Sequence, residues 1–512
     1  MSNNKRIAKN ALLLYVRMIF MMVVSLYTSR VVLKVLGVED FGIYNVVGGV
    51  ITLFGFLNGA MASSTQRYIT FELGKGDAYQ LQKVFQTSVN IHLLIALCIL
   101  FLGETVGLWF FYEKMMIPSS RLLSAFWVYQ FSIFTMMIMI ASVPYNAVII
   151  AHERMSAFAY ISVLEVLLKL GIVYLLYFTR ADKLIIYVAL LFLMQLLVRM
   201  VYGYYCGRHF EESHYKWGWD GRLFKEMLCF GGWNLWGGLA SVLFSQGLNI
   251  LLNLFFGPTV NAARGIAVQV QSAVNQFSIN FQTAMNPQIT KSYAAGDYAY
   301  MYSLIFRSSK FTFLMLAILS FPILLETELV LNLWLETVPS YTVVFVRLML
   351  CITIIDAMAG AFMVSAQATG NIRVYQSVVG SILLFIVPVS YFVLKLGGEP
   401  WSVFVVHLCI CILAFVVRLF IICFMIHFSL YDYFIQVLFR CFGVLCMAVP
   451  LPLFLLIFFP NTLMYGIIIC LVSILMMVFS SYFIGLTVIE REFVNGKILS
   501  FLKIRKNDKY SR

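Results

Sequence analysis

Six polar side chains follow one face of the otherwise apolar segment 260–286. Successive residues of a helix are about 100° apart, so these side chains lie within about 40° of the first of them. They are Arg264, Gln271, Asn275, Ser278, Gln282 and Asn286. An unpaired amide is costly in hydrocarbon, so this face cannot meet lipid. It either forms hydrogen bonds to neighbouring helices or lines a water-filled cavity, and the arginine at its head favours a cavity that binds an anion.

Further polar stripes occur at helical spacing. Segment 260–286 carries a second strip on another side, made of Gln269, Gln276 and Asn280. Segment 225–256 carries Asn234, Gly238, Ser241, Ser245 and Asn249, which supports the same cavity. Segment 41–63 carries Asn45, Gly48, Thr52, Gly55 and Gly59. Four of these last five are glycine or threonine, so close helix packing explains that stripe as well as ligand contact does.

Several other basic residues stand inside apolar segments. Arg17 lies about two turns into its segment, where it either extends to the membrane surface or faces the cavity. Arg199 and Arg418 lie near segment ends, and we expect both to extend to the surface. Arg347 lies in the outer third of its segment, as Arg264 does, and is a second candidate for the cavity wall.

Two acidic residues stand deep in apolar segments. Glu165 precedes Lys169 by one helical turn, the favourable order for an ion pair, so a structural pair is expected before a proton relay. Asp356 has no partner nearby in the sequence. It is the better candidate for a group that couples transport to a proton or another ion, or for a partner of an arginine on another helix.

No catalytic, cofactor or metal motif is present. The chain lacks a phosphate-binding G-x-x-x-x-G-K-[ST] loop, so it does not hydrolyse ATP itself. The ten cysteines have neither C-x-x-C pairs nor metal-ligand spacing. No segment outside the membrane on the outer side exceeds about 15 residues, which leaves no room for a catalytic domain there. No cofactor and no bound metal are therefore predicted.

The elements that position these residues are membrane helices. Apolar residues make up 62% of the 512-residue chain and charged residues 12%, and the apolar residues form blocks long enough to cross a bilayer. The sequence predicts an all-α integral membrane protein of about 14 transmembrane helices. Their predicted bounds are 11–35, 41–63, 84–112, 121–148, 156–178, 184–206, 225–256, 260–286, 302–325, 340–366, 372–395, 401–426, 433–459 and 462–486.

The distribution of basic residues predicts the orientation. Of the 36 Lys and Arg, 23 fall on the side of the chain termini, 7 on the other side and six within spans. Basic residues collect in cytoplasmic loops, so both termini are expected in the cytoplasm. The net charge of +13 then reflects the membrane and not a nucleic-acid partner. The basic start of the chain resembles a signal peptide, but its apolar stretch is too long, and we expect it to be a retained span.

The second half of the chain repeats the first. Gly37 matches Gly257, and Gly76-Asp77 matches Gly296-Asp297, at an offset of 220 residues, while Arg154 matches Arg373 at 219. An even number of helices per repeat predicts two pseudo-symmetric six-helix bundles related by an axis along the membrane normal. The predicted layout is 1–206 for the first bundle, 207–224 for a cytoplasmic connecting loop, 225–426 for the second bundle, 427–486 for helices 13 and 14, and 487–512 for a basic cytoplasmic tail.

The chain resembles a known family of exporters. The first hairpin reads LGVEDFGIY over 36–44, and the first cytoplasmic loop begins QRYI at 66–69 and ends GKGD at 74–77. With the arrangement of six, six and two spans, these motifs resemble the polysaccharide-transporter branch of the multidrug/oligosaccharidyl-lipid/polysaccharide exporter superfamily, which includes the Wzx-type O-antigen flippases. The resemblance covers essentially the whole chain.

The resemblance implies a secondary transporter of the bacterial inner (plasma) membrane that works by alternating access. Its implied cargo is an undecaprenyl-pyrophosphate-linked oligosaccharide, flipped to the outer leaflet for polysaccharide or O-antigen (lipopolysaccharide) biosynthesis. Its implied partners, besides the lipid bilayer, are the polysaccharide polymerase and the chain-length machinery. Such flippases use cavity arginines on helices 1, 2 and 8; here Arg17 and Arg264 match helices 1 and 8, and helix 2 has none.

Two alternatives remain open. A drug/cation antiporter of the same superfamily would need membrane carboxylates, and only Glu165 and Asp356 are available against six basic residues. A membrane-embedded glycan-modifying enzyme would need a catalytic group that the sequence does not offer.

Overall fold

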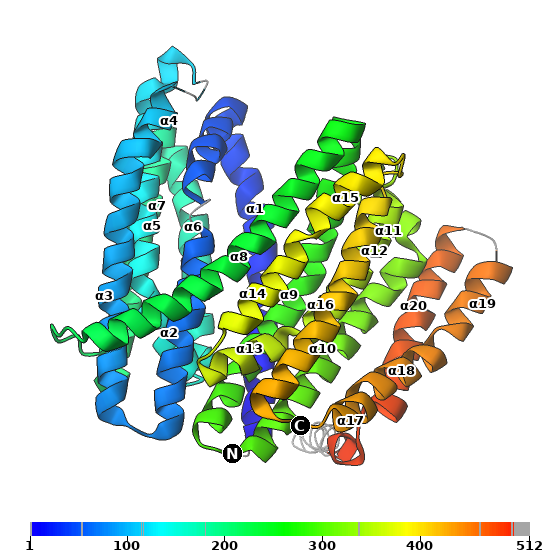
Figure 1. Ribbon diagram of the computed structural model, residues 1–512. Coiled ribbons are helices and arrows are strands. Elements are labelled where there is room, and N and C mark those ends of the chain that lie inside the picture. Colours follow the sequence, from blue (N-terminus) through cyan, green and yellow to red (C-terminus); the bar gives the residue numbers. More distant parts are fainter. Residues whose placement is uncertain are drawn as a thin grey trace, which may run out of the picture. The chain divides into compact units, whose positions relative to one another are not determined.

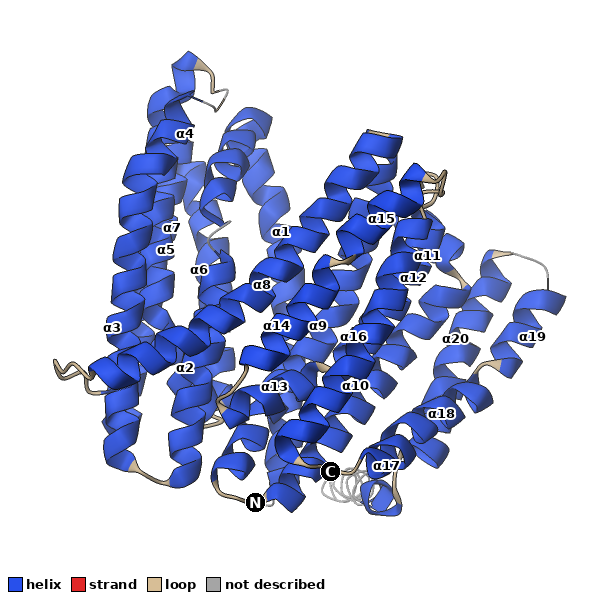
Figure 2. Ribbon diagram, viewed as in Figure 1, coloured by secondary structure: helices blue, strands red, loops and turns tan. Residues whose placement is uncertain are grey.

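A computed structural model describes residues 3–52, 55–113, 115, 117–179, 181–335, 338–459, 462–492 and 495. Every regular element of these residues is a helix (Figure 2). This agrees with the composition, because a backbone surrounded by lipid must satisfy its hydrogen bonds within its own segment.

The first half of the chain forms long helices joined by short turns (Figure 1). Gly37, with φ +83°, interrupts the first of them, so that two helices meet at this residue. The elements are α1 (Asn3–Thr52), α2 (Gly55–Lys75), α3 (Ala78–Leu102), η1 (Gly103–Gly107), α4 (Leu108–Glu113), η2 (Ser119–Arg121), α5 (Leu122–Ala151), α6 (Met155–Leu175), η3 (Leu176–Phe178), α7 (Lys183–His209) and η4 (Glu211–Ser213).

The second half has the same character, with more breaks inside its helices. Its elements are α8 (Gly221–Phe256), α9 (Pro258–Ala294), α10 (Tyr298–Leu325), α11 (Thr327–Trp334), α12 (Thr342–Met358), α13 (Gly360–Thr369), α14 (Arg373–Leu384), α15 (Ile386–Lys395), α16 (Ser402–Ile426), α17 (Leu430–Tyr433), η5 (Phe434–Phe439), α18 (Arg440–Ala448), α19 (Pro450–Phe458), α20 (Leu463–Ser480) and η6 (Ser481–Gly485).

Within the described residues, 11 helical segments are long and apolar enough to cross a membrane. They coincide with predicted spans 3–7 and 9–14. The described residues of predicted spans 1, 2 and 8 are also helical, in α1, α2 and α9, but these helices are not among the 11. For α9 the reason is its polar side chains, whose two strips lower its hydropathy. The structure therefore shows an all-helical membrane protein, and the count of 14 is not confirmed.

Matched positions of the two repeats have the same backbone conformation. Gly37 and Gly257 have φ of +83° and +79°, and Gly76 and Gly296 have φ of +78° and +75°. These are left-handed conformations that glycine adopts without strain. Asp77 then accepts a hydrogen bond from the backbone N–H of Gln80 at 3.0 Å. Its counterpart Asp297 accepts one from Tyr300 at 3.1 Å, so the repeat extends to the caps of the following helices.

The chain divides into two compact units. Unit 1 comprises Met1–Leu243, Asn280–Met301 and Met363–Ser381, and unit 2 comprises Phe244–Ile279, Tyr302–Phe362 and Ile382–Arg512. Each unit has its own apolar core: Val128, Ile133 and Val198 belong to the core of unit 1, and Leu252, Phe345 and Phe404 to that of unit 2. The predicted division into two six-helix bundles stays a proposal.

One arginine joins three turns at an end of unit 1. Arg121, just before α5, donates hydrogen bonds to both carboxylate oxygens of Asp40. It also donates to Asp182 Oδ2 at 2.9 Å, and Asp182 in turn caps the start of α7 by accepting from the N–H of Leu184 at 2.9 Å. We call Arg121, Asp40 and Asp182 the acid–base clamp. It explains why the first hairpin carries an aspartate.

Candidate functional site

Arg264 on α9 is held by neutral oxygens. The residue is 9% exposed. Its Nη2 donates to the carbonyl and hydroxyl oxygens of Ser245 at 2.8 and 3.2 Å, and its Nη1 donates to Asn249 Oδ1 at 3.2 Å. Ser245 and Asn249 are one turn apart on α8, on the stripe that the sequence predicted. The buried Nε has no hydrogen-bond partner. This cation therefore has polar support but no carboxylate among its hydrogen-bond partners.

The remaining stripe residues of α9 are largely covered. Ser278 is buried, Gln271 and Asn275 are half-buried in unit 2, and Gln282 is half-buried in unit 1. Gln269, on the second strip, is exposed, as are Thr259 and Ser272 of the same helix. The stripe headed by Arg264 thus faces protein for much of its length, with Gln269 on the accessible side.

Asp356 on α12 has a partner on another helix. Arg418 Nη1, on α16, donates to Asp356 Oδ1 at 2.6 Å. The side chain of Arg418 is 11% exposed and that of Asp356 is 57% exposed. The charge of Arg418 is therefore compensated within unit 2, and Asp356 has the arginine partner on another helix that was one of its two predicted roles.

Arg347 occupies a separate small cavity in unit 2. Its Nε donates to Thr327 Oγ1 at 3.1 Å, at the start of α11. The cavity has a volume of about 250 Å³ and is also lined by Glu326 and Glu328 and by residues of α19 and α20. Arg347 has no contact with the Ser245 and Asn249 oxygens that hold Arg264, so the structure does not bring these two predicted site residues together.

Arg17 and the predicted ion pair lie in unit 1. Arg17 Nη1 donates to Ser162 Oγ at 3.2 Å, and its guanidinium carbon lies 4.3 Å from the centre of the Phe158 ring. One turn further along α6, Lys169 Nζ donates to Glu165 Oε1 at 2.9 Å, which confirms the predicted pair. Lys169 is therefore paired with a carboxylate, whereas the hydrogen bond of Arg17 goes to a neutral hydroxyl.

Asn234 on α8 belongs to an amide cluster of unit 1. It is 5% exposed, and its Oδ1 accepts from Gln376 Nε2 at 3.0 Å and from Gln367 Nε2 at 3.3 Å. Asn234 thus lies in a different unit from Arg264. The side chains of the predicted stripe at Asn45, Gly48, Thr52 and Gly55 lie outside the described residues, and Gly59 is exposed.

Arg67, near the end of α2, makes contacts that the sequence did not indicate. It is 9% exposed. Its Nε donates to the carbonyl oxygen of Gln367 at 2.9 Å, and its Nη2 donates to that of Ala368 at 3.1 Å. The last carbonyls of a helix carry partial negative charge, so a guanidinium is well placed at the end of α13. Gly370 follows with φ +82°, and a Cβ there would lie 2.7 Å from Arg67 Nη2.

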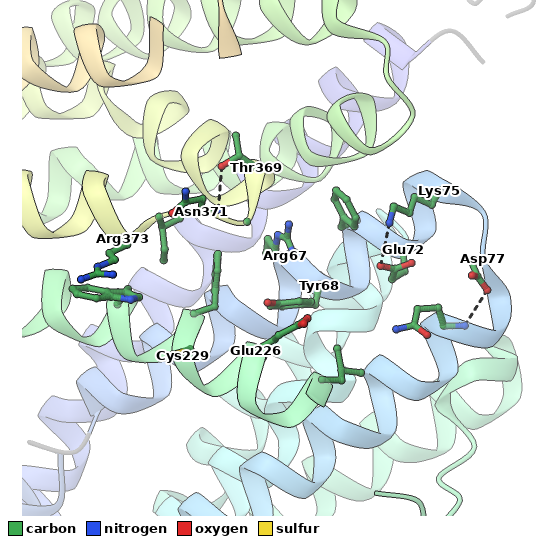
Figure 3. Close-up of a pocket in the computed structure, with 17 residues that line it drawn as sticks. Arg67, Tyr68, Glu72, Lys75, Asp77, Glu226, Cys229, Thr369, Asn371 and Arg373 are labelled. Atoms are coloured by element: carbon green, nitrogen blue, oxygen red, sulfur yellow. Dashed lines mark hydrogen bonds and ion pairs between the residues drawn. The ribbon is translucent and has the colours of Figure 1, made fainter. Parts of the chain in front are cut away.

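A cavity of about 720 Å³ lies beside Arg67. Figure 3 shows its lining, which comes from α2, the start of α3, the first turns of α8 and the turn between α13 and α14. The guanidinium of Arg67 lies 4.5 Å from the ring centres of Tyr68 and Phe71 and 5.5 Å from that of Phe230. The guanidinium of the second arginine, Arg373, lies 5.4 Å from the ring of Trp233.

The acidic residues of this cavity are largely neutralised. Glu226 accepts from Arg222 Nε at 3.1 Å, and Glu72 lies 4.0 Å from Lys75 Nζ. Burial, reinforced by Asp77, raises the pKa of Glu72 above its ordinary value although Lys75 opposes this. The lining therefore carries three carboxylates, Glu72, Asp77 and Glu226, beside Arg67, Lys75 and Arg373 and several aromatic rings, and two of these carboxylates have a basic partner.

A matching contact lies at the end of α9. Glu153, in the turn after α5, accepts from Gln288 Nε2 at 2.6 Å and from Lys291 Nζ at 3.0 Å. Its side chain is fully buried. Nearby, a Cβ on Gly74 of α2 would lie 2.7 Å from the Cβ of Ala294, so α2 and α9 touch at their ends.

The fold matches solved transporter structures. A multidrug resistance MATE family transporter of the MOP superfamily, in an outward-facing conformation, superposes with a TM-score of 0.73 over 83% of this chain and 96% of its own, at 12% identity. The chain has the MATE transporter fold. It is thus a multi-pass integral membrane protein. No protein-family model and no curated protein sequence matches the chain.

Two further structures share this fold. A MOP superfamily transporter from Pyrococcus furiosus, described as having a binding pocket of reverse polarity that suggests a different function, has a TM-score of 0.69 and 13% identity over 84% of this chain and 98% of its own. The MATE transporter ClbM, in complex with Rb⁺, has a TM-score of 0.67 and 14% identity over 84% of this chain and 96% of its own. At these identities the likeness shows the fold and not the cargo.

Proposed function

We propose that this protein is a flippase that moves an undecaprenyl-pyrophosphate-linked oligosaccharide from the cytoplasmic to the outer leaflet of a bacterial inner membrane. The proposal includes 14 spans, arranged as two six-helix bundles and a terminal pair, with both termini in the cytoplasm. The MATE fold supports transport by alternating access between two sides of the bilayer. The polymerase and chain-length machinery would then use the flipped product.

The balance of charge within the two units carries the proposal. In unit 1, Lys169 is paired with Glu165, and Arg17 donates to the neutral hydroxyl of Ser162. In unit 2, Asp356 is paired with Arg418, and Arg264 is held by neutral oxygens alone among its hydrogen-bond partners. Each group keeps a net positive charge. A buried guanidinium is costly unless an anion joins it, and a diphosphate can accept two parallel hydrogen bonds from it.

The cavity residues of this proposal follow from the same argument. In unit 2, Arg264 is the candidate for binding the diphosphate, Gln271 and Asn275 are candidates for hydrogen bonds with sugar hydroxyls, and Arg347 is a further basic candidate. In unit 1, Arg17 is the candidate for binding the diphosphate, and Gln282 and Asn234 are candidates for hydrogen bonds with sugar hydroxyls. Asp356 and Glu165 are the candidates for coupling to a proton or another ion. Both carboxylates are already paired with a basic side chain, so any coupling must break an ion pair.

A drug/cation antiporter is the alternative within the same fold. ClbM, which was solved with Rb⁺, shows that proteins of this fold can hold a monovalent cation. The paired state of Glu165 and Asp356 opposes that role here, and the Pyrococcus furiosus structure indicates that pocket polarity varies within the fold. A glycan-modifying enzyme has no support in the fold.

Binding of a diphosphate lipid to Arg264 tests the proposal. Purified protein in nanodiscs should bind undecaprenyl diphosphate, and Arg264→Ala should weaken binding by about 2 kcal/mol, the strength of a hydrogen bond to a charged group. Arg264→Lys should restore it only partly, because an ammonium lacks the planar fork. Arg208→Ala, at an exposed arginine of α7, is the control. Equal binding by Arg264→Ala, together with ethidium export driven by a proton or sodium gradient, would favour the antiporter.

A further inference from the structure

Two contacts in unit 1 join the first repeat to the second, at matching positions of the repeat. Arg67 joins the end of α2, in the first repeat, to the turn after α13, in the second. Glu153 joins the turn after α5, in the first repeat, to the end of α9, in the second. We call these the Arg67 latch and the Glu153 latch. The ends of α2 and α9 match at an offset of 220 residues, and the two turns match at 219. Any separation of the two repeats at this end must therefore break both latches.

We propose that the cavity beside Arg67 binds the diphosphate of the cargo on the cytoplasmic side, and that this binding releases the Arg67 latch. The inference rests on the proposed function, because the diphosphate is the anionic group of that cargo. It assigns to Arg67 a role distinct from that of Arg264: Arg67 senses the cargo before the repeats separate, and Arg264 binds it afterwards.

The cavity has the composition of a site for a phosphorylated sugar. Its volume of about 720 Å³ lies within the usual range for small-molecule pockets, about 300–1,000 Å³. Arg67 and Arg373 supply cationic forks, and Tyr68, Phe71 and Trp233 supply aromatic faces. The lining also includes the amides Gln80 and Asn371 and the hydroxyl of Thr369, groups that bind sugar hydroxyls.

Arg67 can exchange one set of acceptors for another. In the latched state its Nε and Nη2 donate to two neutral carbonyl oxygens, at 2.9 and 3.1 Å. A phosphate oxygen carries full charge, and hydrogen bonds to it are about twice as strong as neutral ones. Because Arg67 lines the cavity, a diphosphate bound there competes directly with the carbonyls of Gln367 and Ala368. A ligand shifts a conformational equilibrium only if it binds one of the two states more tightly. Here the diphosphate binds more tightly to the state in which Arg67 no longer donates to the carbonyls of α13.

A buried serine offers a reporter for release of the latch. Ser64 of α2 is fully buried and its hydroxyl donates to the carbonyl oxygen of Met227 on α8, at 3.4 Å. The two helices come from different repeats, so separation exposes residue 64. We would place Ser64→Cys in a full-length chain whose ten native cysteines are replaced, and measure the rate of maleimide labelling in nanodiscs. The probes are farnesyl diphosphate and inorganic pyrophosphate.

Farnesyl diphosphate should raise the labelling rate about tenfold, which corresponds to a shift of about 1.4 kcal/mol. Arg67→Lys should raise the rate without ligand and remove the response, because an ammonium cannot hold both carbonyls. Arg373→Ala removes the second guanidinium of the cavity and should weaken the response to ligand. Arg208→Lys, at an exposed arginine outside the cavity, is the matched control and should behave as the parent protein. A response to pyrophosphate of equal size would indicate that free diphosphate suffices, and a response to farnesyl diphosphate alone would indicate that the lipid is required.

The outcomes separate this inference from the proposed function. Two outcomes would overturn the latch inference and leave the flippase proposal standing. In the first, farnesyl diphosphate binds in an Arg264-dependent manner but the labelling rate of Ser64→Cys does not change. In the second, the labelling rate of the Arg67→Lys variant responds to the ligand as that of the parent does. If farnesyl diphosphate binds neither the parent protein nor any variant, the proposed cargo is wrong.

Discussion

The intramembrane charges of this chain differ in what compensates them. Lys169 and Arg418 each contact a carboxylate, whereas the hydrogen bonds of Arg264 go to a serine and an asparagine. A charge that is paired with a carboxylate stabilises the fold as long as both members are present. A charge that is held by neutral groups is available to a ligand. The kind of hydrogen-bond partner therefore distinguishes structural from functional basic residues better than their depth in the membrane does.

The Asp356–Arg418 pair should show strong coupling in a double-mutant cycle. Asp356→Asn and Arg418→Met should each lower the melting temperature in detergent, because each leaves one charge without its partner. The double variant should be more stable than the sum of the single effects predicts, by about 1 kcal/mol or more. Additive effects would show that the 2.6 Å contact contributes no net interaction.

Sequence patterns predicted some of these side-chain contacts and missed others. Glu165 and Lys169 are one turn apart, so local spacing was enough to predict their pair. Asp356 and Arg418 are 62 residues apart, and Arg67 and Gln367 are 300 apart, so no local pattern connects them. Arg67 was further hidden because its partners are main-chain carbonyls, which have no sequence signature. The repeat match that follows it in the chain, at Gly76-Asp77, was the available signal.

At the scale of elements, the turns are positioned by few groups. The acid–base clamp holds the first hairpin, the start of α5 and the start of α7 through one guanidinium. Its members are partly exposed, with side chains that are 28% accessible for Arg121 and 26% for Asp182. Its contribution should therefore be moderate and sensitive to salt.

Loss of the clamp should destabilise the protein. Arg121→Ala should lower the free energy of unfolding by about 2 kcal/mol, as expected for the loss of hydrogen bonds to charged groups. It should therefore also lower the melting temperature in detergent. Burial raises the pKa of Asp182, but the Ser124 hydroxyl, the Ile185 N–H and Arg121 outweigh it, so the pKa lies below its ordinary value of 3.8. A carboxyl with a lowered pKa stabilises the fold above its ordinary pKa, and this is lost as the pH falls through the lowered one. The difference between parent and variant should thus persist down to about pH 4 and shrink below it. A constant difference at pH 2 would contradict this account.

The helices themselves were predicted well because hydropathy records burial in lipid directly. Both ends of α6, α7 and α16, and the last residue of α15, agree with the predicted bounds to within three residues. Helix α9 shows the limit of hydropathy as a signal. Its polar strips keep it out of the 11 apolar segments, although it forms a helix of 37 residues. Helix breaks such as the one between α12 and α13 were not predicted. A continuous run of apolar residues does not indicate where the backbone leaves the helical conformation.

At the scale of the whole molecule, orientation is the first property to measure. The distribution of basic residues predicts that the segment between α7 and α8 is cytoplasmic. Lys216→Cys, at an exposed position in that segment, should resist an impermeant thiol reagent in intact cells and react after permeabilisation. Lys395→Cys, also exposed but on the predicted outer side, is the matched control and should react in intact cells. The reverse pattern would invert the proposed topology. Ser213 would be a poor choice because it is 4% exposed.

The close approach of α2 and α9 has a consequence for how such a chain could arise. Gly74 and Ala294 are 220 residues apart, so they are the same position of the repeat, and they touch each other. Contact between equivalent residues is the signature of an isologous interface, the kind that two identical half-length chains would form about a twofold axis. At this point two methyl groups would clash, since the Cβ atoms would lie 2.7 Å apart. Once the halves were fused in one gene, one copy could keep glycine while the other gained a methyl group, a division of labour that a homodimer of identical halves could not achieve.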